Sequence, residues 1–441
     1  MFLCKLLNDF VCKARRGTDL PGRPTGRDRT GPQTTGMALL VAAVMMVNLP
    51  RAGAQTRDTI SSVTMEDAVT IATQNNLEAR NAQLTVEQTQ AAPGSFLDLH
   101  PTSINYFRGQ IHSPMTHGLL TISQTLGSPV ESYYHSRKND HQLTWQKARA
   151  ALTRKRVARQ TRLAYNHWIF MINKKKILRE KLEHYQELKR IAGLRYEKGA
   201  ITLLEKTQAE TQFHQAQNAV REAYKNIARA GNRLRGIMNT SHTLTPGTDS
   251  LQVYRIQHPS AARGREMIDP LLLKTAKEKV RIKELDWKAQ KASLFPDITA
   301  GYFMQSMAGD ERLSGWSVGI SVPLWFRPVQ NNIRQARIEK QKAENLRRKK
   351  AREHQNQIQN LLRELNHQRE QLRYYHHQGL KQARMLVNNA EKRYHNEDIG
   401  YPEYLEGLET AFEIETGYLE TLKSYNQAAI KLDYFIKQSM L

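Results

Sequence analysis

The stretch RYEKGAITLLEKTQAE at residues 195–210 opens with the same Arg-Tyr pair as the stretch RYHNEDIGYPEYLEGLE at residues 393–409, which begins 198 positions later. Long runs rich in Ala, Leu, Gln, Glu, Lys and Arg flank both stretches, and this composition favours helices. Pro402 suits the first turn of a helix that starts again after a break. Both stretches are therefore predicted to be tips, where a long helix ends and a return helix begins.

An internal repeat extends beyond the two tips. An offset of 198 aligns the flanking runs without a gap, which indicates a duplicated unit. The aligned identical pairs are Leu163/Leu361, Leu182/Leu380, Leu188/Leu386, Ala192/Ala390, Arg195/Arg393, Tyr196/Tyr394, Ile201/Ile399 and Leu234/Leu432. We interpret the chain as a first repeat at 55–239, a linker at 240–265 that contains Pro, Gly and Ser, and a second repeat at 266–441.

Each repeat has the same predicted order of a short helix, two strands, a long helix and a return helix. The elements of the first repeat are expected at about 65–92, 100–112, 118–126, 131–196 and 203–238. Those of the second repeat are expected at about 269–293, 295–306, 315–326, 330–394 and 402–438. Pro129 and Pro328 mark the turns from strand into long helix. Each long helix would measure on the order of 95 to 100 Å, which is longer than a globular domain needs.

The long helices carry narrow apolar stripes, which predict packing in a coiled-coil layer with water on the remaining faces. The stripe residues are Tyr165, Trp168, Ile172, Leu178, Leu182, Tyr185, Leu188 and Ala192 in the first helix, and Leu361, Leu365, Leu372 and Tyr375 in the second.

The strands show a period of two, with one apolar face. Trp316, Val318, Ile320, Val322 and Leu324 alternate with small residues and a proline. Aromatic residues suited to a membrane interface cluster at Tyr106, Phe107, Tyr302, Phe303, Trp325 and Phe326. Each strand has the length that spans a bilayer when tilted. Four strands cannot close a barrel alone, so strands in a membrane imply an oligomer.

The N-terminal segment 1–54 is predicted to be a leader and signal peptide. Residues 37–49 form an apolar run too short to span a bilayer, and Ala52 and Ala54 give a cleavage site before Gln55. Cys4 and Cys12 lie upstream, so the mature chain would have no cysteine and no thiolate metal site. The alternative is a cytosolic protein whose first helix is apolar.

The chain is basic, with a net charge of +24. Removing the eight Lys/Arg and three Asp/Glu of segment 1–54 leaves +19. In a cytosolic protein this balance would suggest nucleic acid, but export favours anionic lipid or an acidic partner instead. The basic runs at 154–159 and 347–352 are predicted to be solvated outer faces of the helices; the alternative is a basic collar in an oligomer that contacts lipopolysaccharide phosphates or a partner protein.

The duplicated unit resembles the TolC family of outer-membrane efflux ducts over residues 60–438. The motifs are FPDITAGYF at 295–303, WSVGISVPLWF at 316–326, NNIRQARIEKQKAE at 331–344 and the paired RYEKGAI and RYHNEDI turns. ISQTLGSPVESYY at 122–134 is similar to the CusC/CzcC-like branch that serves heavy-metal cation pumps.

The resemblance implies a mainly α fold with a β-barrel part. A homotrimer would form a 12-stranded barrel in the outer membrane, continued by a 12-helix barrel in the periplasm. It further implies a passive duct without cofactor that meets outer-membrane lipid, a periplasmic membrane-fusion adaptor and an inner-membrane RND pump, but no nucleic acid. The cargo expected from the branch is heavy-metal cations; the alternatives are drugs, secreted polypeptides, or a coiled-coil protein that forms no channel.

The resemblance also assigns residues at the tips. Glu205, Glu403 and Glu406 fall where family members carry the acids that narrow the closed pore, although acids in a first helical turn also simply stabilise the helix dipole. Glu397 stands where a tip glycine is usual. The residues expected to form the tips and to contact the adaptor are Arg195, Tyr196, Gly199, Arg393, Tyr394, Gly400 and Pro402.

No catalytic or metal-binding motif stands out in the sequence. His376 and His377 are adjacent and diverge on a helix, and no nucleophile elbow, phosphate-binding glycine loop or metalloprotease helix is present. The sequence therefore predicts a protein that is not an enzyme.

Overall fold

The computed structural model describes residues 62–91, 101–110, 117–256, 269–306, 312–322 and 326–436. The chain divides into two compact units, Met1–Arg57 and Asp58–Leu441, and every described residue belongs to the second. The predicted leader and signal peptide at 1–54, the end of the linker at 257–265, and Leu324 and Trp325 lie outside the described residues.

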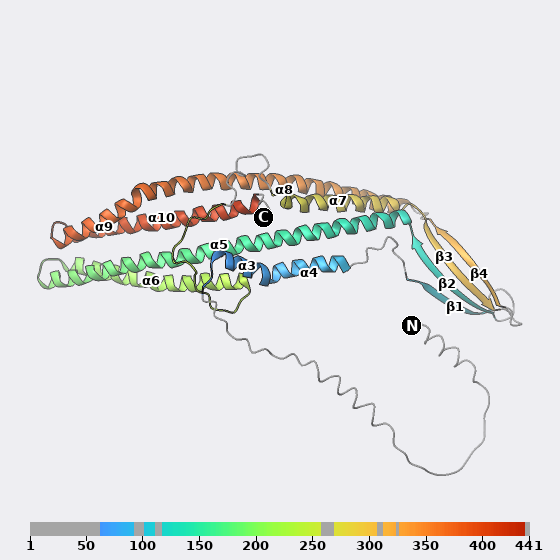
Figure 1. Cartoon of the computed structure of the whole chain (residues 1–441), viewed down its shortest axis with the longest axis horizontal. Helices are drawn as coiled ribbons and strands as arrows, with labels where there is room; N and C mark the ends of the chain where they lie inside the picture. Colours follow the sequence, from blue (N-terminus) through green and yellow to red (C-terminus); the bar gives the residue numbers. More distant parts are fainter. Residues whose placement is uncertain are drawn as a thin grey trace, which may run out of the picture. The chain divides into compact units, whose positions relative to one another are not determined.

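The helices follow one another in the same order in both repeats (Figure 1). The first repeat contains α3 (Met65–Asn75), α4 (Leu77–Ala91), α5 (Pro129–Glu197) and α6 (Leu203–Met238). The second contains α7 (Pro270–Ala292), α8 (Phe326–Tyr374), the π-helical turn η2 (Tyr375–Gly379), α9 (Leu380–His395) and α10 (Tyr401–Phe435). With 69 residues, α5 is about 100 Å long. It packs against α4 and α7 toward the sheet and against α6 and α10 toward the tips.

The four strands form one antiparallel sheet. They are β1 (Ser103–Gly109), β2 (His117–Gly127), β3 (Asp297–Ser306) and β4 (Arg312–Ser321), in the order β1-β2-β3-β4. The two strands of each repeat pair with each other, and β2 pairs with β3 to join the repeats. Among the described residues, no further strand pairs with the edge strands β1 and β4.

Adjacent rows of the sheet differ in chemistry in the half nearer the long helices, whereas at the far end Phe107, Leu119 and Leu313 put apolar side chains on the second face as well. Register pairing aligns Ile104, Ile122, Tyr302 and Trp316 in one row across all four strands, and the Tyr302 and Trp316 rings lie 5.1 Å apart. The adjacent row, on the opposite face, contains only small residues: Ser103, Ser123, Gly301 and Ser317. A Cβ at Gly301 would lie 2.5 Å from the Ser317 hydroxyl, so this face is packed closely.

Small residues at heptad spacing hold the first hairpin together. Ala209, Ala216, Ala223 and Ala230 recur every seven residues along α6, and all four are buried. A repeat of seven keeps one narrow stripe facing a partner helix, and the small alanine side chain lets the backbones approach closely. The stripe predicted on α5 lies in the core at Tyr165, Trp168, Tyr185, Leu188 and Ala192.

The first part of the linker packs against the helices as a strap, which we define as residues 241–256. Asn426 is 1% exposed, and its amide accepts from Tyr254 N at 2.8 Å and donates to Gln252 O at 2.7 Å and to Asn166 Oδ1 at 2.9 Å. Tyr254 Oη donates to Asp433 at 3.0 Å. Because each of these buried polar groups has a partner, the network stabilises one position of the strap.

The structure corrects two predicted helices. The helix expected at 65–92 is broken at Asn76, whose Oδ1 accepts from the backbone N–H groups of Glu78 and Ala79 and so caps α4. The helix expected at 330–394 is interrupted by η2. There the Tyr375 ring packs where Gly417 of α10 leaves room, since a Cβ at Gly417 would lie 2.5 Å from Tyr375 Oη. Phe326, expected at the end of a strand, instead begins α8.

The strap network gives a first prediction. The substitution Asn426→Ala removes partners from the Tyr254 N–H, the Gln252 carbonyl and the Asn166 side chain, and it should lower the free energy of unfolding by about 3 kcal/mol or more. Chemical denaturation of the purified protein measures this change. The exposed helical residue Asn218 provides the control, because Asn218→Ala should change stability by less than about 0.5 kcal/mol. Equal effects of the two substitutions would contradict the role assigned to the network.

Candidate functional site at the hairpin tips

The two tips have the same backbone hydrogen bonds. After α5, Ala200 N donates to Arg195 O at 2.8 Å and Gly199 N donates to Tyr196 O at 2.9 Å. After α9, Asp398 N donates to Arg393 O at 2.8 Å and Glu397 N donates to Tyr394 O at 3.3 Å. This pair of bonds defines a Schellman motif, which closes a helix through one residue in the left-handed region.

Gly199 and Glu397 are those left-handed residues, with φ of 71° and 64°. Glycine adopts this conformation without strain, whereas a residue with a Cβ does so at a free-energy cost of about 1 kcal/mol or more. The sequence difference between the tips therefore falls at the one position where it strains the backbone.

The return helices start differently. Thr202 and Glu205 form a capping box at the start of α6, in which the Glu205 carboxylate accepts from Thr202 N at 2.8 Å. Gly400 occupies the corresponding cap of α10 and has no side chain to bond there. Glu403, the equivalent of Glu205, lies instead 3.6 Å from Arg393, and both side chains are exposed. Glu205 thus has a structural partner in its own helix, while Glu403 has only a solvated ion pair.

Arg195 joins the two tips. Its guanidinium donates to Tyr394 O at 2.8 Å and lies 4.4 Å from the centre of the Tyr394 ring. The Tyr394 ring stacks on Tyr404 with centroids 4.5 Å apart and planes 3° apart. Burial raises the pKa of both phenols, so neither ionises near neutral pH. A cation, two stacked rings and a carbonyl therefore link the end of α5 to α9 and α10.

Glu406 lies beside a groove between α6 and α10 rather than beside Arg393. The groove encloses about 510 Å³, and its lining includes three carboxylates, Glu406, Glu409 and Glu413, and no Lys or Arg. Glu409 accepts from Tyr185 Oη at 3.4 Å. Glu403 and Glu406 are both exposed, but their immediate surroundings differ.

The remaining predicted residues have structural places. Tyr196 lies under the Lys206 ammonium, which is 4.9 Å from its ring centre. Pro402 is in the first turn of α10, Pro129 is the first residue of α5, and Pro328 is the third residue of α8. Sequence reasoning missed Tyr404 and Glu409. Their helical spacing of five residues gives no signal that one stacks on Tyr394 and the other reaches Tyr185.

Neither a spanning helix nor a metal centre is found in the described part of the chain. None of the described helices combines the length and the apolarity that crossing a membrane requires. Among the described residues, no group of three or more His, Cys, Asp or Glu side chains is placed to hold a metal ion.

Comparison with known proteins identifies the fold. No protein-family model and no curated protein matches the chain in sequence. The structure of the Campylobacter jejuni CmeC outer membrane channel matches with a TM-score of 0.73 and 15% identity, over 89% of this chain and 95% of that chain. The open state of the Neisseria gonorrhoeae MtrE outer membrane channel matches with a TM-score of 0.67 and 13% identity, over 84% and 88%. The chain has the fold of an outer-membrane channel.

A third match is a crystal structure of CusC, which was studied for the conformational changes that accompany its folding and transmembrane channel formation. It has a TM-score of 0.70 and 16% identity, over 84% of this chain and 92% of that chain. The prediction of a TolC-like chain is therefore confirmed at the level of the fold of one chain. In this channel fold the two tips lie at the opposite end of α5 from the sheet.

The left-handed residues give a second prediction. The substitution Glu397→Gly should raise the free energy of unfolding by about 0.5 to 1 kcal/mol, because the strain it removes exceeds the exposed contact with Arg195 at 3.8 Å that it loses. Gly199→Ala should lower stability by about 1 kcal/mol through the backbone alone, since no atom lies within 4 Å of the new Cβ. Denaturant titration compares the two variants, and a destabilised Glu397→Gly protein would contradict the strain.

Proposed function

We propose that the protein is the outer-membrane exit duct of a tripartite efflux system and that it acts as a homotrimer. The observation that carries the proposal is the fold, an open four-stranded sheet at one end of a layer of very long helices, which the chain shares with outer-membrane channels. The duct is passive, and it uses neither a catalytic residue nor a cofactor.

The sheet supports closure by copies of itself. Strands β1 and β4 are the two edges of the sheet that the structure describes, and in a meander of four antiparallel strands they run in opposite directions. Pairing β4 of one copy with β1 of the next therefore continues the antiparallel pattern, and three copies give a 12-stranded barrel. Trp316 and Val318 are each 82% exposed and Ile320 is 73% exposed, which suits contact with lipid.

The helical layer supports the same symmetry. Toward the sheet the neighbours follow the order α4, α5, α7 and α8, and toward the tips the order is α6, α5, α10 and α9. Four helices at each level, with two free flanks, give a 12-helix periplasmic barrel in a trimer. The chain would then sit in the outer membrane of a Gram-negative bacterium, with its helical part in the periplasm and no contact with nucleic acid.

The tips are the proposed meeting point with a periplasmic membrane-fusion adaptor, which links the duct to an inner-membrane RND pump. Tyr196, Gly199, Arg393, Gly400 and Pro402 are exposed at the tips and are the proposed contacts. Tyr394, also predicted to contact the adaptor, is instead 0% exposed, and with Arg195 it supports this surface from within. In the trimer, Glu403 and Glu406 of three chains would bring six carboxylates around the closed end, and Glu205 would support the neighbouring hairpin through its capping box.

Heavy-metal cations are the proposed cargo, by resemblance to the CusC/CzcC-like branch. The acidic groove at Glu406, Glu409 and Glu413 supports cation entry at the tips. Deleting the gene should lower the copper, zinc or cobalt concentration that stops growth, and the wild-type gene should restore it. A deletion strain sensitive to dyes and detergents but not to metal ions would replace this cargo with drugs. Sensitivity to neither would contradict an efflux role.

The gate gives a third prediction. In planar bilayers, Glu403→Gln combined with Glu406→Gln should raise the closed-state conductance and weaken block by multivalent cations, because the substitutions remove carboxylates from the end of the pore. Glu87→Gln combined with Glu370→Gln changes charge equally at exposed positions on α4 and α8, remote from the tips, and should leave the closed state unchanged. Unchanged currents in the tip variant would remove these acids from the gate.

A further inference from the structure

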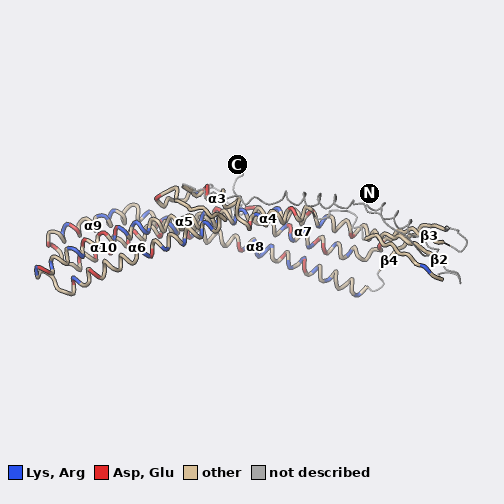
Figure 2. Tube along the Cα trace, turned by 90° about the horizontal axis from the view of Figure 1, so that it is seen from below, with Lys and Arg blue, Asp and Glu red and all other residues tan. Residues whose placement is uncertain are grey.

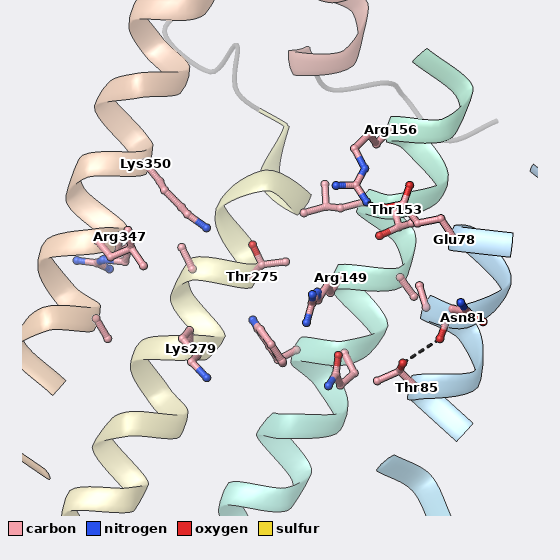
Figure 3. A pocket seen from close by; sticks show the side chains of 18 of the residues that line it. Glu78, Asn81, Thr85, Arg149, Thr153, Arg156, Thr275, Lys279, Arg347 and Lys350 are labelled. Atoms are coloured by element: carbon pink, nitrogen blue, oxygen red, sulfur yellow. Dashed lines mark hydrogen bonds and ion pairs between the residues drawn. The ribbon is translucent and has the colours of Figure 1, made fainter. Parts of the chain in front are cut away.

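A second charged cavity lies toward the sheet, where all four helices of the layer take part (Figure 3). It encloses about 710 Å³ between α4, α5, α7 and α8. Five of its lining residues are basic, namely Arg149, Arg156, Lys279, Arg347 and Lys350, and Glu78 is the one acidic residue in the lining. The two basic runs at 154–159 and 347–352, which are far apart in sequence, each contribute to this cavity.

The internal repeat places equivalent residues in this cavity. With the offset of 198, Arg149 corresponds to Arg347 and Asn81 corresponds to Lys279, and all four line the cavity. The pairs Glu78/Ala276 and Trp145/Ala343 obey the same rule. Both repeats therefore turn the same helix face to the same side of the layer.

That side is opposite the strap. Tyr165 follows Arg156 by nine residues, about two and a half helical turns, so the two side chains leave α5 in opposite directions. Tyr165 Oη donates to Val63 O, and Val63 pairs with the strap at Pro246. In a closed trimer, a strap inside the helical barrel would block the passage, so the strap must lie on the outside of the barrel. The basic cavity then faces the passage.

The basic groups are poorly neutralised. Arg156 pairs with Glu78, whereas Arg149 and Lys279 lie 5.3 Å and 4.8 Å from the centre of the Trp145 ring. An aromatic face attracts a cation but leaves its charge in place. Lys350 has neither an ion pair nor a hydrogen bond in the part of the chain that the structure describes. Lys and Arg are frequent along α5 and α8 (Figure 2).

We propose that this cavity binds dissolved phosphate-type oxyanions as they pass through the duct. Guanidinium and ammonium groups are the donors that such anions prefer, and the hydroxyl of Thr153 adds a further donor. That the site faces the passage rests on the proposed function, while binding itself does not. Trp145 and Arg156 lie 16 and 27 residues from the start of α5, about 24 to 40 Å from the sheet, which favours a dissolved anion over a lipid headgroup.

The test uses the full-length mature protein in detergent and inorganic pyrophosphate as the probe. Pyrophosphate should raise the melting temperature of the wild type, and the shift should shrink at high salt because screening shortens the reach of the charges. Lys279→Gln combined with Lys350→Gln should weaken the apparent affinity about fivefold or more. The control is Lys274→Gln combined with Lys277→Gln, which removes the same charge from α7 residues that do not line the cavity, and its affinity should match the wild type.

A second variant distinguishes loss of the binding site from loss of the folded structure. Lys350→Gln alone removes no ion pair or hydrogen bond among the described residues, so it should fold as the wild type does and still weaken binding. Equal affinities in the cavity variants and the control would overturn the site. A melting shift produced by phosphatidylglycerol bicelles but not by pyrophosphate would overturn it as well, in favour of a lipid site.

Planar bilayers separate this inference from the proposed duct. Pyrophosphate should reduce the open-channel current, and the lysine pair in the cavity should require about fivefold more pyrophosphate for the same block. If the protein binds pyrophosphate but never conducts, the anion site stands and the proposed channel function is wrong. If the protein conducts and the cavity substitutions do not change block by pyrophosphate, the proposed channel function stands and the anion site is wrong.

Discussion

Close contact between helices through small side chains is the constraint on which the rest of the structure depends. The helix α5 is about 100 Å long and packs against α4 and α7 toward the sheet and against α6 and α10 toward the tips, so each contact runs along a narrow stripe. Ala209, Ala216, Ala223 and Ala230 keep that stripe in line on α6, and the buried residues of α5 meet it. Once α5 and α6 are fixed side by side, the short turn between them has little freedom. The tip geometry and the exposure of its charged residues then follow.

Most of the fold could be predicted from the sequence, because the same helix and strand signals occur in both repeats. The return helix predicted at 203–238 has the bounds observed for α6, and the alternation around Trp316 correctly indicated the strand β4. The helix break at Asn76 was not predicted, because an asparagine is also common on the polar face of a continuous helix. Only the structure shows that its side chain caps α4. The π-helical turn depends on Gly417, which lies on another helix.

The candidate site was predictable in position but not in contacts. The repeated Arg-Tyr pair located both tips, yet the stacking of Tyr394 on Tyr404 and the bond from Arg195 to the Tyr394 carbonyl depend on how α5, α9 and α10 pack. The difference between Glu205 and Glu403 also needed the structure, because it arises from the residue that caps each return helix. Two of the described pockets differ in charge, since the groove near the tips is acidic and the cavity toward the sheet is basic.

The matched lengths of the two long helical segments limit how such a chain can change. The 69 residues of α5 correspond to the 49, 5 and 16 residues of α8, η2 and α9, so both tips are reached after nearly the same count from the sheet. Deleting one residue from one segment would draw its tip back by about 1.5 Å and rotate it by about 100°. The two tips would then differ in height and in rotation, so a partner could no longer contact both in the same way. A change in length that keeps both tips level and preserves the packed stripes would add or remove whole heptads in both repeats together.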